Sequence, residues 1–444
     1  MLGEMQMGKL VPKVSLPIMI SMIVQAMYNV VDSIFVARLS EDALTAVTLA
    51  FPLQNLMIAV ASGTGVGVNA LLSKSLGEKR FDRSDKAANT AIFLSFCNFA
   101  IFALIGMTLS AAFIHSQTQD AVVAGYGITY LRIVMGLSLG ISFQIMLERL
   151  LQSTGRTVFS MASQLTGAII NIILDPIMIF GLFGCPAFGV AGAAYATVIG
   201  QTVAAMIGLI LNLRYNADIR ISMRSILQPN AKIIGRIYQV GVPSILMMAI
   251  GSLMTYMMNR ILIGFSNTAT AVFGVYFKLQ SFFFMPIFGL NNGLIPVLAY
   301  NYGARNRSRI DEALKFSVAL AVCIMGLGTI IFHVMPNRLL DLFNASDDMR
   351  VIGVPALRII SLHFPVAALC IVMGSIFQAF SRSLYSLVIS VTRQLLVLIP
   401  AAWLLARTGV VTNVWFAFPI AEVFSLIISV ICFRRLYGEV VKPM

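Results

Sequence analysis

Long apolar runs recur along the whole chain, and each could cross a lipid bilayer as one helix, which takes about 20 residues. Such runs restrict the chain to a membrane fold, in which every backbone polar group must be satisfied internally. Their continuity favours helices over barrel strands, which are about ten residues long and alternate in polarity. We therefore expect an all-α membrane protein with twelve transmembrane helices. The predicted spans lie near residues 15–38, 45–72, 87–114, 122–148, 158–182, 190–213, 237–265, 270–300, 313–335, 351–380, 384–406 and 412–433.

Composition leaves little room for anything else. Of 444 residues, 59% are hydrophobic and only 11% are charged, whereas about a quarter of the residues in a soluble domain are charged. Twelve helices of about 25 residues use roughly 300 residues, and the remainder is enough only for loops and tails. No soluble catalytic domain fits, so we do not expect an enzyme.

The net charge of +13 could suggest a nucleic-acid partner, but the positions of the charges argue against one. With the N-terminus placed inside, 22 of the 31 Lys and Arg residues fall on the inner side, and positive charge marks the cytoplasmic side of a membrane protein. We therefore predict a multi-pass protein of the cytoplasmic (inner) membrane with both termini in the cytoplasm and no nucleic-acid partner. The inner residues are Lys9, Lys13, Lys74, Lys79, Arg80, Arg83, Lys86, Arg149, Arg156, Arg214, Arg220, Arg224, Lys232, Arg236, Arg305, Arg307, Arg309, Lys315, Arg382, Arg434, Arg435 and Lys442.

The two halves of the chain repeat at a fixed offset of 226 residues. The repeat predicts an N-lobe over 1–213, a cytoplasmic linker over 214–236 and a C-lobe over 237–444. Two six-helix lobes inserted in the same direction are related by a pseudo-twofold axis along the membrane normal, and such duplication suits alternating access. A duplicated scaffold that transports nothing stays an alternative. The offset pairs Pro17 with Pro243, Gln54 with Gln280, Gly67 with Gly293, Asp85 with Asp311, Gln152 with Gln378 and Arg156 with Arg382.

Polar residues inside the spans form stripes on one helical face. A charge in mid-bilayer costs several kcal/mol, so a buried acid needs a reason. The first span places side chains at i, i+3, i+4 and i+7, and the fifth span repeats the pattern with its own acid. The sixth span returns from outside with two further hydrogen-bonding groups. The residues concerned are Gln25, Tyr28, Asn29 and Asp32 in the first span, Gln164, Asn171 and Asp175 in the fifth, and Thr197 and Gln201 in the sixth.

Asp32 and Asp175 lie at similar depth, so we expect them to share one pocket. Two neighbouring carboxylates in a poorly hydrated site cannot both stay ionised at low cost. The pair can therefore bind H⁺ or Na⁺ and release it when another cation arrives, with no cofactor and no structural metal. The alternative is a polar cluster that only fixes helix packing.

Two further acids lie in or at the edge of spans. Glu148 fits an interfacial or packing ion near the inner end of the fourth span. Glu422 in the twelfth span is expected either to pair with a cation or to contact substrate. The candidate cations are Lys278, Arg260 and Arg393.

Several segments resemble the multidrug and toxic compound extrusion (MATE) transporters. The stretch from Pro17 through Tyr28 and Asp32 to Val36 is similar to that family's first-span pattern, and Asn171-xxx-Asp175-Pro176 to its fifth-span pattern. The resemblance implies export of amphipathic, often cationic, compounds driven by H⁺ or Na⁺. It also implies a coupling site at Tyr28, Asp32, Asn171 and Asp175, with Thr197 as the matching residue of the sixth span.

We therefore predict a monomeric antiporter, surrounded by membrane lipid, that exchanges organic cations and drugs for H⁺ or Na⁺. A lipid-linked sugar flippase of the same superfamily is one alternative, although the interior arginines needed to bind a pyrophosphate are missing from four first-half spans. An intramembrane aspartyl protease is another, although its GxGD context is absent. The predicted substrate contacts are Gln25, Asn29, Gln54, Gln164, Gln201, Gln280, Phe283 and Met285.

Overall fold

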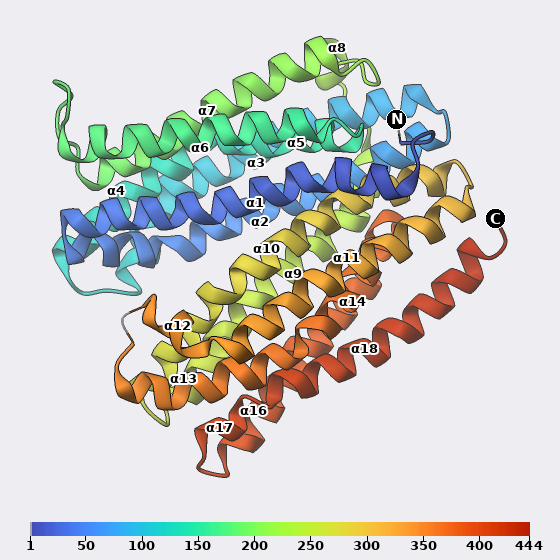
Figure 1. Ribbon diagram of the computed structural model, residues 1–444. Coiled ribbons are helices and arrows are strands. Elements are labelled where there is room, and N and C mark those ends of the chain that lie inside the picture. The colour runs from blue at the N-terminus through green and yellow to red at the C-terminus, as the bar shows by residue number, and fades with distance from the viewer. Residues whose placement is uncertain (1, 344) are drawn as a thin grey trace. The chain divides into compact units, whose positions relative to one another are not determined.

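The computed structural model describes residues 2–343 and 345–444, and this part of the chain is helical with no strand. Eleven of its helical segments are long and apolar enough to cross a membrane. A further span consists of two helices, Ala121–Gly136 and Leu139–Ser153, which meet at a bend of 47°. The predicted all-α membrane fold with twelve spans is thereby confirmed (Figure 1).

Contacts divide the chain into two compact units. One unit comprises Ile20–Gly241, and the other comprises Met1–Met19 together with Val242–Met444. Both boundaries fall inside long helices, α1 (Met7–Leu39) and α9 (Ala231–Leu262), so each of these helices contributes to both units.

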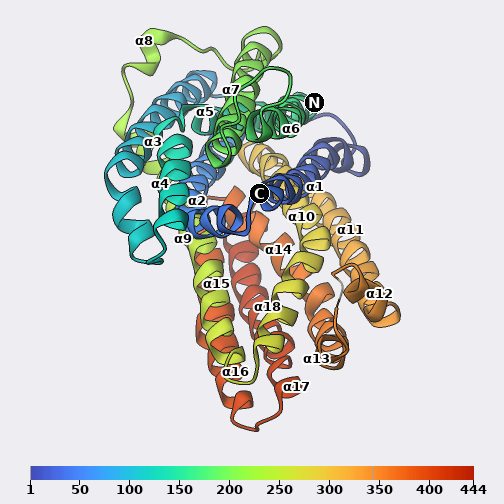
Figure 2. The same cartoon turned by 90° about the vertical axis from the view of Figure 1, so that its left-hand side faces the viewer.

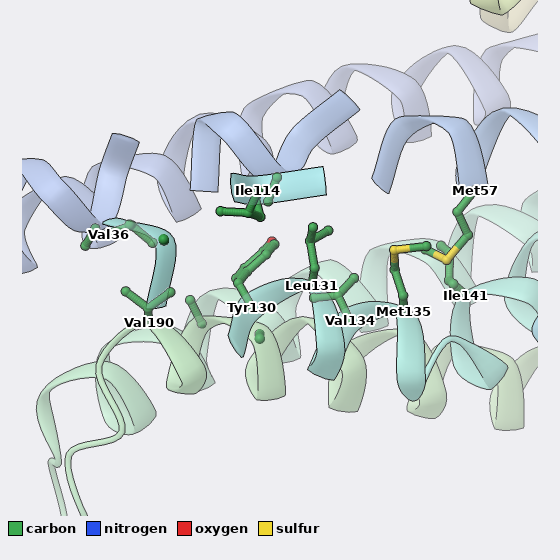
Figure 3. Close-up of a cluster of buried hydrophobic side chains, with 14 of the residues drawn as sticks. Val36, Met57, Ile114, Tyr130, Leu131, Val134, Met135, Ile141 and Val190 are labelled. Atoms are coloured by element: carbon green, nitrogen blue, oxygen red, sulfur yellow. The ribbon is translucent and has the colours of Figure 1, made fainter. Parts of the chain in front are cut away.

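The unit of Ile20–Gly241 holds the second part of α1 and the beginning of α9. In it α7 packs along α4, α5 and α6, while α2 contacts α3, α4 and α5 (Figure 1). Its apolar core is filled by side chains such as Ile114, Tyr130, Leu131 and Met135. Figure 3 shows Tyr130 and Leu131 reaching toward Ile114, and Met135 beside Met57. Its complete helices are α2 (Glu41–Gly77), α3 (Phe81–His115), α4 (Ala121–Gly136), α5 (Leu139–Ser153), α6 (Thr157–Phe180), α7 (Val190–Tyr215) and the short α8 (Met223–Ile226).

The other unit is built around α14, which contacts α10, α11, α15 and α18 (Figure 2). Its α15 continues into a π-helical segment, an uncommon geometry that is frequent at functional sites. Its elements are α10 (Asn267–Gly303), α11 (Arg307–Val334), α12 (Pro336–Asp341), α13 (Asp347–Ile360), η1 (Ser361–His363), α14 (Phe364–Ala379), α15 (Ser383–Val391), η2 (Thr392–Leu398), α16 (Ile399–Ala406), α17 (Val411–Val414), α18 (Ala417–Leu436) and η3 (Tyr437–Val441).

The internal repeat extends to details of the backbone. Helices α2 and α10 have bounds that differ by the same 226 residues, and each is capped by a serine, Ser40 or Ser266, whose hydroxyl accepts a backbone N–H at 3.0 Å. The turns that follow contain Lys79 and Arg305, with φ of 59° and 54°. A left-handed conformation is uncommon for such residues, so its recurrence at equivalent positions supports a true duplication.

Two glycines at equivalent positions explain why α1 and α9 are divided. A Cβ on Gly67 of α2 would lie 2.1 Å from the carbonyl oxygen of Ile237 in α9. A Cβ on Gly293 of α10 would lie 2.5 Å from the hydroxyl of Ser15 in α1. Small residues allow helix backbones to approach this closely, so the start of α9 packs on α2 and the start of α1 packs on α10.

Candidate ion-coupling site

The site begins with a close approach of α6 to α7. A Cβ on Gly200 of α7 would lie 2.7 Å from the carbonyl oxygen of Gly167 in α6, and a Cβ on Gly167 would lie 2.9 Å from that of Gly200. Because neither residue has a side chain, the backbones meet and the next turn of α6 is carried against α7.

That next turn holds Asn171, which is 3% exposed and faces Thr197 of α7. The Asn171 amide nitrogen donates to the Thr197 hydroxyl at 3.3 Å, and this hydroxyl donates to the carbonyl oxygen of Ala193 at 3.0 Å. The Asn171 amide oxygen is buried and accepts no hydrogen bond from the protein. It is therefore free to accept a hydrogen bond or to bind a cation.

One turn further along α6, Asp175 is completely buried. Its carboxyl group lies within hydrogen-bonding reach of Asp32 on α1, and Tyr28 lies near both acids. Neither oxygen of Asp175 accepts a hydrogen bond from a protein donor, and one buried oxygen of Asp32 also has no donor. The sequence prediction that these two acids share one site therefore has a geometric basis.

A pocket that is open to one side adjoins the acids near α5. Polar side chains without formal charge make up much of its wall, and one pair of them is joined by a hydrogen bond of 2.8 Å from Gln164 to Gln25. Tyr28 and Asn171 contribute to the wall and also lie next to the acids, so they connect the two parts of the site. The lining residues are Val24, Gln25, Tyr28, Ile141, Gln144, Gln164, Gly167, Ala168, Asn171, Thr197 and Gln201.

These groups define what the site can do. Ionised carboxylates only accept hydrogen bonds, so two of them within reach of each other form a bond only if one carries a proton. Alternatively a cation can be held by the carboxylate oxygens and an amide oxygen, which are hard ligands. Both forms bring positive charge into a buried acidic site.

Most of the predicted first-half residues gather here. The structure brings together Gln25, Tyr28, Gln164, Thr197 and Gln201 in the pocket wall. Asn29 does not line the pocket, and its side chain is exposed at the edge of the polar stripe of α1. Gln54 of α2 lies in the same unit but outside the pocket lining, where it accepts a 3.5 Å hydrogen bond from Tyr130.

The remaining predicted substrate contacts belong to α10 in the other unit. The Gln280 amide oxygen accepts a 2.7 Å hydrogen bond from the hydroxyl of Tyr276. Phe283 packs edge-on against Phe332, with 5.8 Å between ring centroids. Met285 follows on the same helix and is partly buried. Their role in substrate binding stays a prediction.

Two residues near the site were not foreseen. Tyr130 of α4 is 2% exposed and lies close enough to both acids to interact electrostatically with them. Gln144 of α5 lines the pocket and donates to Glu148 at 3.0 Å. The spacing of Gln144 and Glu148, four residues apart on one helical face, was the one feature of the sequence that could have indicated their contact.

In the other unit, Glu422 pairs with Arg393, one of the three cations that the sequence offered as its partner. Arg393 of the π-helical segment η2 lies 3.6 Å from one carboxylate oxygen of Glu422, while the other oxygen is buried without a donor. The pair accounts for a buried charge in the unit that contains Val242–Met444.

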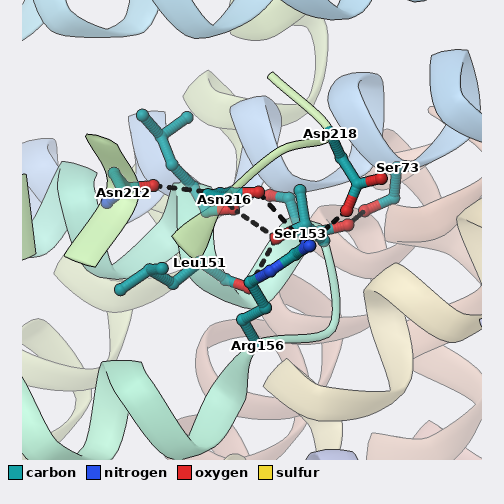
Figure 4. Close-up of polar contacts among 9 residues, drawn as sticks. Ser73, Leu151, Ser153, Arg156, Asn212, Asn216 and Asp218 are labelled. Atoms are coloured by element: carbon teal, nitrogen blue, oxygen red, sulfur yellow. Dashed lines mark hydrogen bonds and ion pairs between the residues drawn. The ribbon is translucent and has the colours of Figure 1, made fainter. Parts of the chain in front are cut away.

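A polar network joins the C-terminal end of α5 to the N-terminal end of α6 (Figure 4). The Ser73 hydroxyl donates to the carbonyl oxygen of Ser153 at 2.7 Å. The Arg156 guanidinium donates to Asn216 at 3.2 Å and forms an ion pair with Asp218. Asn212 of α7 donates to the carbonyl oxygen of Leu147 at 2.9 Å. The C-terminal ends of α2, α5 and α7 and the N-terminal end of α6 are thereby tied together.

Comparisons with known proteins agree with this architecture. A MATE in complex with MaL6 superposes with a TM-score of 0.93 at 24% identity, covering 99% of this chain and 98% of the other. A MOP superfamily transporter from Pyrococcus furiosus gives a TM-score of 0.90 at 25% identity, with 99% and 98% coverage.

Relatives are also found by sequence. The multidrug export protein MepA of Staphylococcus haemolyticus is 25% identical over 409 residues, or 92% of this chain and 89% of the relative. MepA of Staphylococcus aureus (strain MSSA476) is 24% identical over 417 residues, with 92% and 89% coverage.

The duplicated helical fold is that of a multi-pass membrane protein and is shared with the solved MATE structures. The MatE family profile matches residues 17–177 and 243–404, which is well over half of the sequence. The chain therefore belongs to the MatE family, and the predicted resemblance is confirmed.

Proposed function

We propose that this protein is a secondary active multidrug efflux antiporter that exports amphipathic organic cations in exchange for H⁺ or Na⁺ by alternating access. The observation that carries the proposal is the acid pair: Asp32 and Asp175 lie within hydrogen-bonding reach, and neither oxygen of Asp175 accepts a protein hydrogen bond. A proton or a small cation satisfies such a pair, and a second cation can displace it. Competition of this kind couples two fluxes.

The pocket beside the acids supports an amphipathic cation as substrate. Gln25, Gln164 and Gln201 offer amide oxygens, while Val24 and Ile141 offer apolar contact. Among the described lining residues there is no lysine or arginine that would repel a cation. The multidrug export named for the MepA relatives is consistent with this chemistry.

We place the protein in the cytoplasmic membrane as a monomer with both termini inside. The support is the charge distribution, because the turns after α2 and α10 carry Lys79, Arg80 and Arg305 at the same end of equivalent helices. Retention of positive charge on the cytoplasmic side sets the orientation of such helices. The short sequence between α4 and α3, by comparison, carries Asp120 and no lysine or arginine.

The test is transport in proteoliposomes that contain the purified protein. Ethidium flux is measured under an imposed pH gradient, an imposed Na⁺ gradient, or neither. We expect one gradient to drive the dye, and the gradient that does so identifies the coupling ion. Flux that ignores both gradients would contradict antiport.

Asp175→Asn tests the site itself, since it keeps the shape of the side chain and removes its ability to ionise. We expect gradient-driven flux to fall to the level of empty vesicles while the protein still inserts. Asp120→Asn is a matched control, because Asp120 is an exposed helix-capping acid. Unchanged coupling in Asp175→Asn would remove the acid pair from the mechanism.

A further inference from the structure

Glu148 is a buried acid beside the pocket that the coupling mechanism does not use. It lies on α5, is 7% exposed, and receives a hydrogen bond of 3.0 Å from the amide nitrogen of Gln144. Gln144 itself lines the pocket together with Tyr28, Asn171 and Thr197. One side chain thus separates Glu148 from the pocket of the coupling site.

The charged surroundings of Glu148 are sparse. The charge that acts on it comes from Arg149, the next residue in the chain, whose guanidinium donates to Gln152 at 2.9 Å. The helices packed against α5 are α2, α3, α6 and α7, and their described residues contribute no ion pair to Glu148. A buried carboxyl with one amide donor and no ion-pair partner is suited to taking up a proton.

Glu148 lies between the pocket and the C-terminal end of α5. Gln144 is four residues nearer to the pocket, and the helix ends at Ser153, about 7–8 Å beyond Glu148 at the usual rise per residue. At that end lie Gln152, which donates to Ser160 at 2.9 Å, and the basic turn containing Arg156. Glu148 therefore lies between the pocket and the end of the unit that the positive-inside rule assigns to the cytoplasm.

The Gln144 side chain lies between the pocket of the coupling site and the carboxyl group of Glu148. An amide donates and accepts hydrogen bonds but does not exchange a proton as a carboxyl group does, so its bond to Glu148 insulates the acid from the pocket. The amide oxygen of Gln144 is buried and has no donor, so its known hydrogen bond is the one to Glu148. The backbone beside it is held, because Asn212 donates to Leu147 at 2.9 Å. Opening this contact therefore requires rotation of one side chain and no displacement of α5.

We propose that Glu148 is a proton-binding residue through which the coupling pocket releases its proton to the cytoplasm, and that Gln144 is the gate between them. This inference rests on the proposed function in its proton-coupled form. When Gln144 turns away and water enters, the O–H bond of the protonated acid pair breaks and an O–H bond forms on the Glu148 carboxylate. The same proton then passes to cytoplasmic water, which restores the carboxylate.

Glu148→Gln tests the release step, because the amide is nearly isosteric and still accepts a bond from Gln144. Ethidium flux driven by a pH gradient should fall on the order of tenfold or more, as expected when a proton-transfer group is removed. Exchange of labelled for unlabelled ethidium without a gradient needs no net proton release, so it should stay within about twofold of the wild type. A merely structural role would reduce both rates together and would overturn the proposal, as would an unchanged driven flux.

Gln144→Ala tests the gate with a separate readout. Vesicles with a trapped pH indicator and no dye substrate should acidify faster than wild-type vesicles, because the insulating side chain is gone. The double variant Gln144→Ala/Glu148→Gln should lose this leak, and Gln164→Ala, another pocket glutamine, serves as the control for simple widening. Absence of a leak, or a leak that does not need Glu148, refutes the gate.

The outcomes separate this inference from the proposed function. If Asp175→Asn abolishes coupling while Glu148→Gln transports normally, the antiport proposal stands and the release route falls. If the wild type is driven by Na⁺ alone, the release route is also overturned. If no gradient drives the wild type, the antiport proposal itself fails.

Discussion

The contact between Gly167 and Gly200 should be essential to the coupling site, and Gly200→Ala tests this. The added Cβ would lie 2.7 Å from the Gly167 carbonyl oxygen and 3.2 Å from the Cβ of Asn171. The first partner is backbone, so the helices must separate by several tenths of an ångström. Overpacking of this kind costs about 1–3 kcal/mol. It should also lengthen the 3.3 Å hydrogen bond from Asn171 to Thr197 beyond useful range.

Gly125→Ala is the matched control, because Gly125 is exposed on α4 and an added Cβ there would meet no atom within 4 Å. Both substitutions gain the same helix propensity, roughly 1 kcal/mol, so their difference isolates the packing cost. At about 2–4 °C per kcal/mol for a unit of this size, the two melting temperatures should differ by about 2–12 °C.

Thermal unfolding of the purified protein in detergent, followed by intrinsic fluorescence, measures this difference. Gradient-driven ethidium flux should also fall in Gly200→Ala and stay unchanged in Gly125→Ala. If the two variants melt together and transport equally, the close approach of α6 to α7 does not position the site, and the reasoning from Gly200 is refuted.

Three further outcomes are expected. Asp32→Asn should abolish resistance to a cationic dye in growing cells while membrane levels stay normal, and resistance equal to the wild type would contradict coupling at α1. Arg393→Ala should destabilise the protein by about 3–5 kcal/mol, because Glu422 would be left buried without its partner. The double variant Arg393→Met/Glu422→Leu should recover most of the lost melting temperature, and a failure to recover would argue against a structural pair. Arg156→Met should cost about 1 kcal/mol or less in the same assay, since its ion pair with Asp218 is partly exposed, and a large loss would be unexpected.

The sequence was sufficient for the fold because lipid imposes a simple rule. Each span must be apolar and internally hydrogen-bonded, so hydropathy alone located the spans and the offset of 226 residues exposed the duplication. The bend at Leu137–Ser138 was missed, and residues 122–148 were expected to form one continuous span. No proline marks this break, but Gly136, Ser138 and Gly140 surround it, and glycine–serine pairs are a common cause of helix kinks.

The acid pair could be anticipated from helical spacing, whereas its surroundings could not. The periodicity that places Tyr28 and Asp32 on one face also included Asn29, yet the edge of that face is exposed. Gln144 and Tyr130 come from helices whose rotation the sequence does not specify. For Glu422 the sequence offered three cations, and the geometry of η2 selects Arg393. The assignment of these residues to ion coupling and substrate binding stays a prediction.

The division of α1 and α9 has a mechanical consequence. Each is a continuous helix, yet one part belongs to one compact unit and the remainder to the other, with boundaries after Met19 and Gly241. Pro17 and Pro243 lie within two residues of these boundaries, where a proline weakens the helical hydrogen-bond ladder. If one unit rotates, α1 and α9 must bend, because the chain passes between the units only through these two helices. These two helices are therefore the hinges of the molecule.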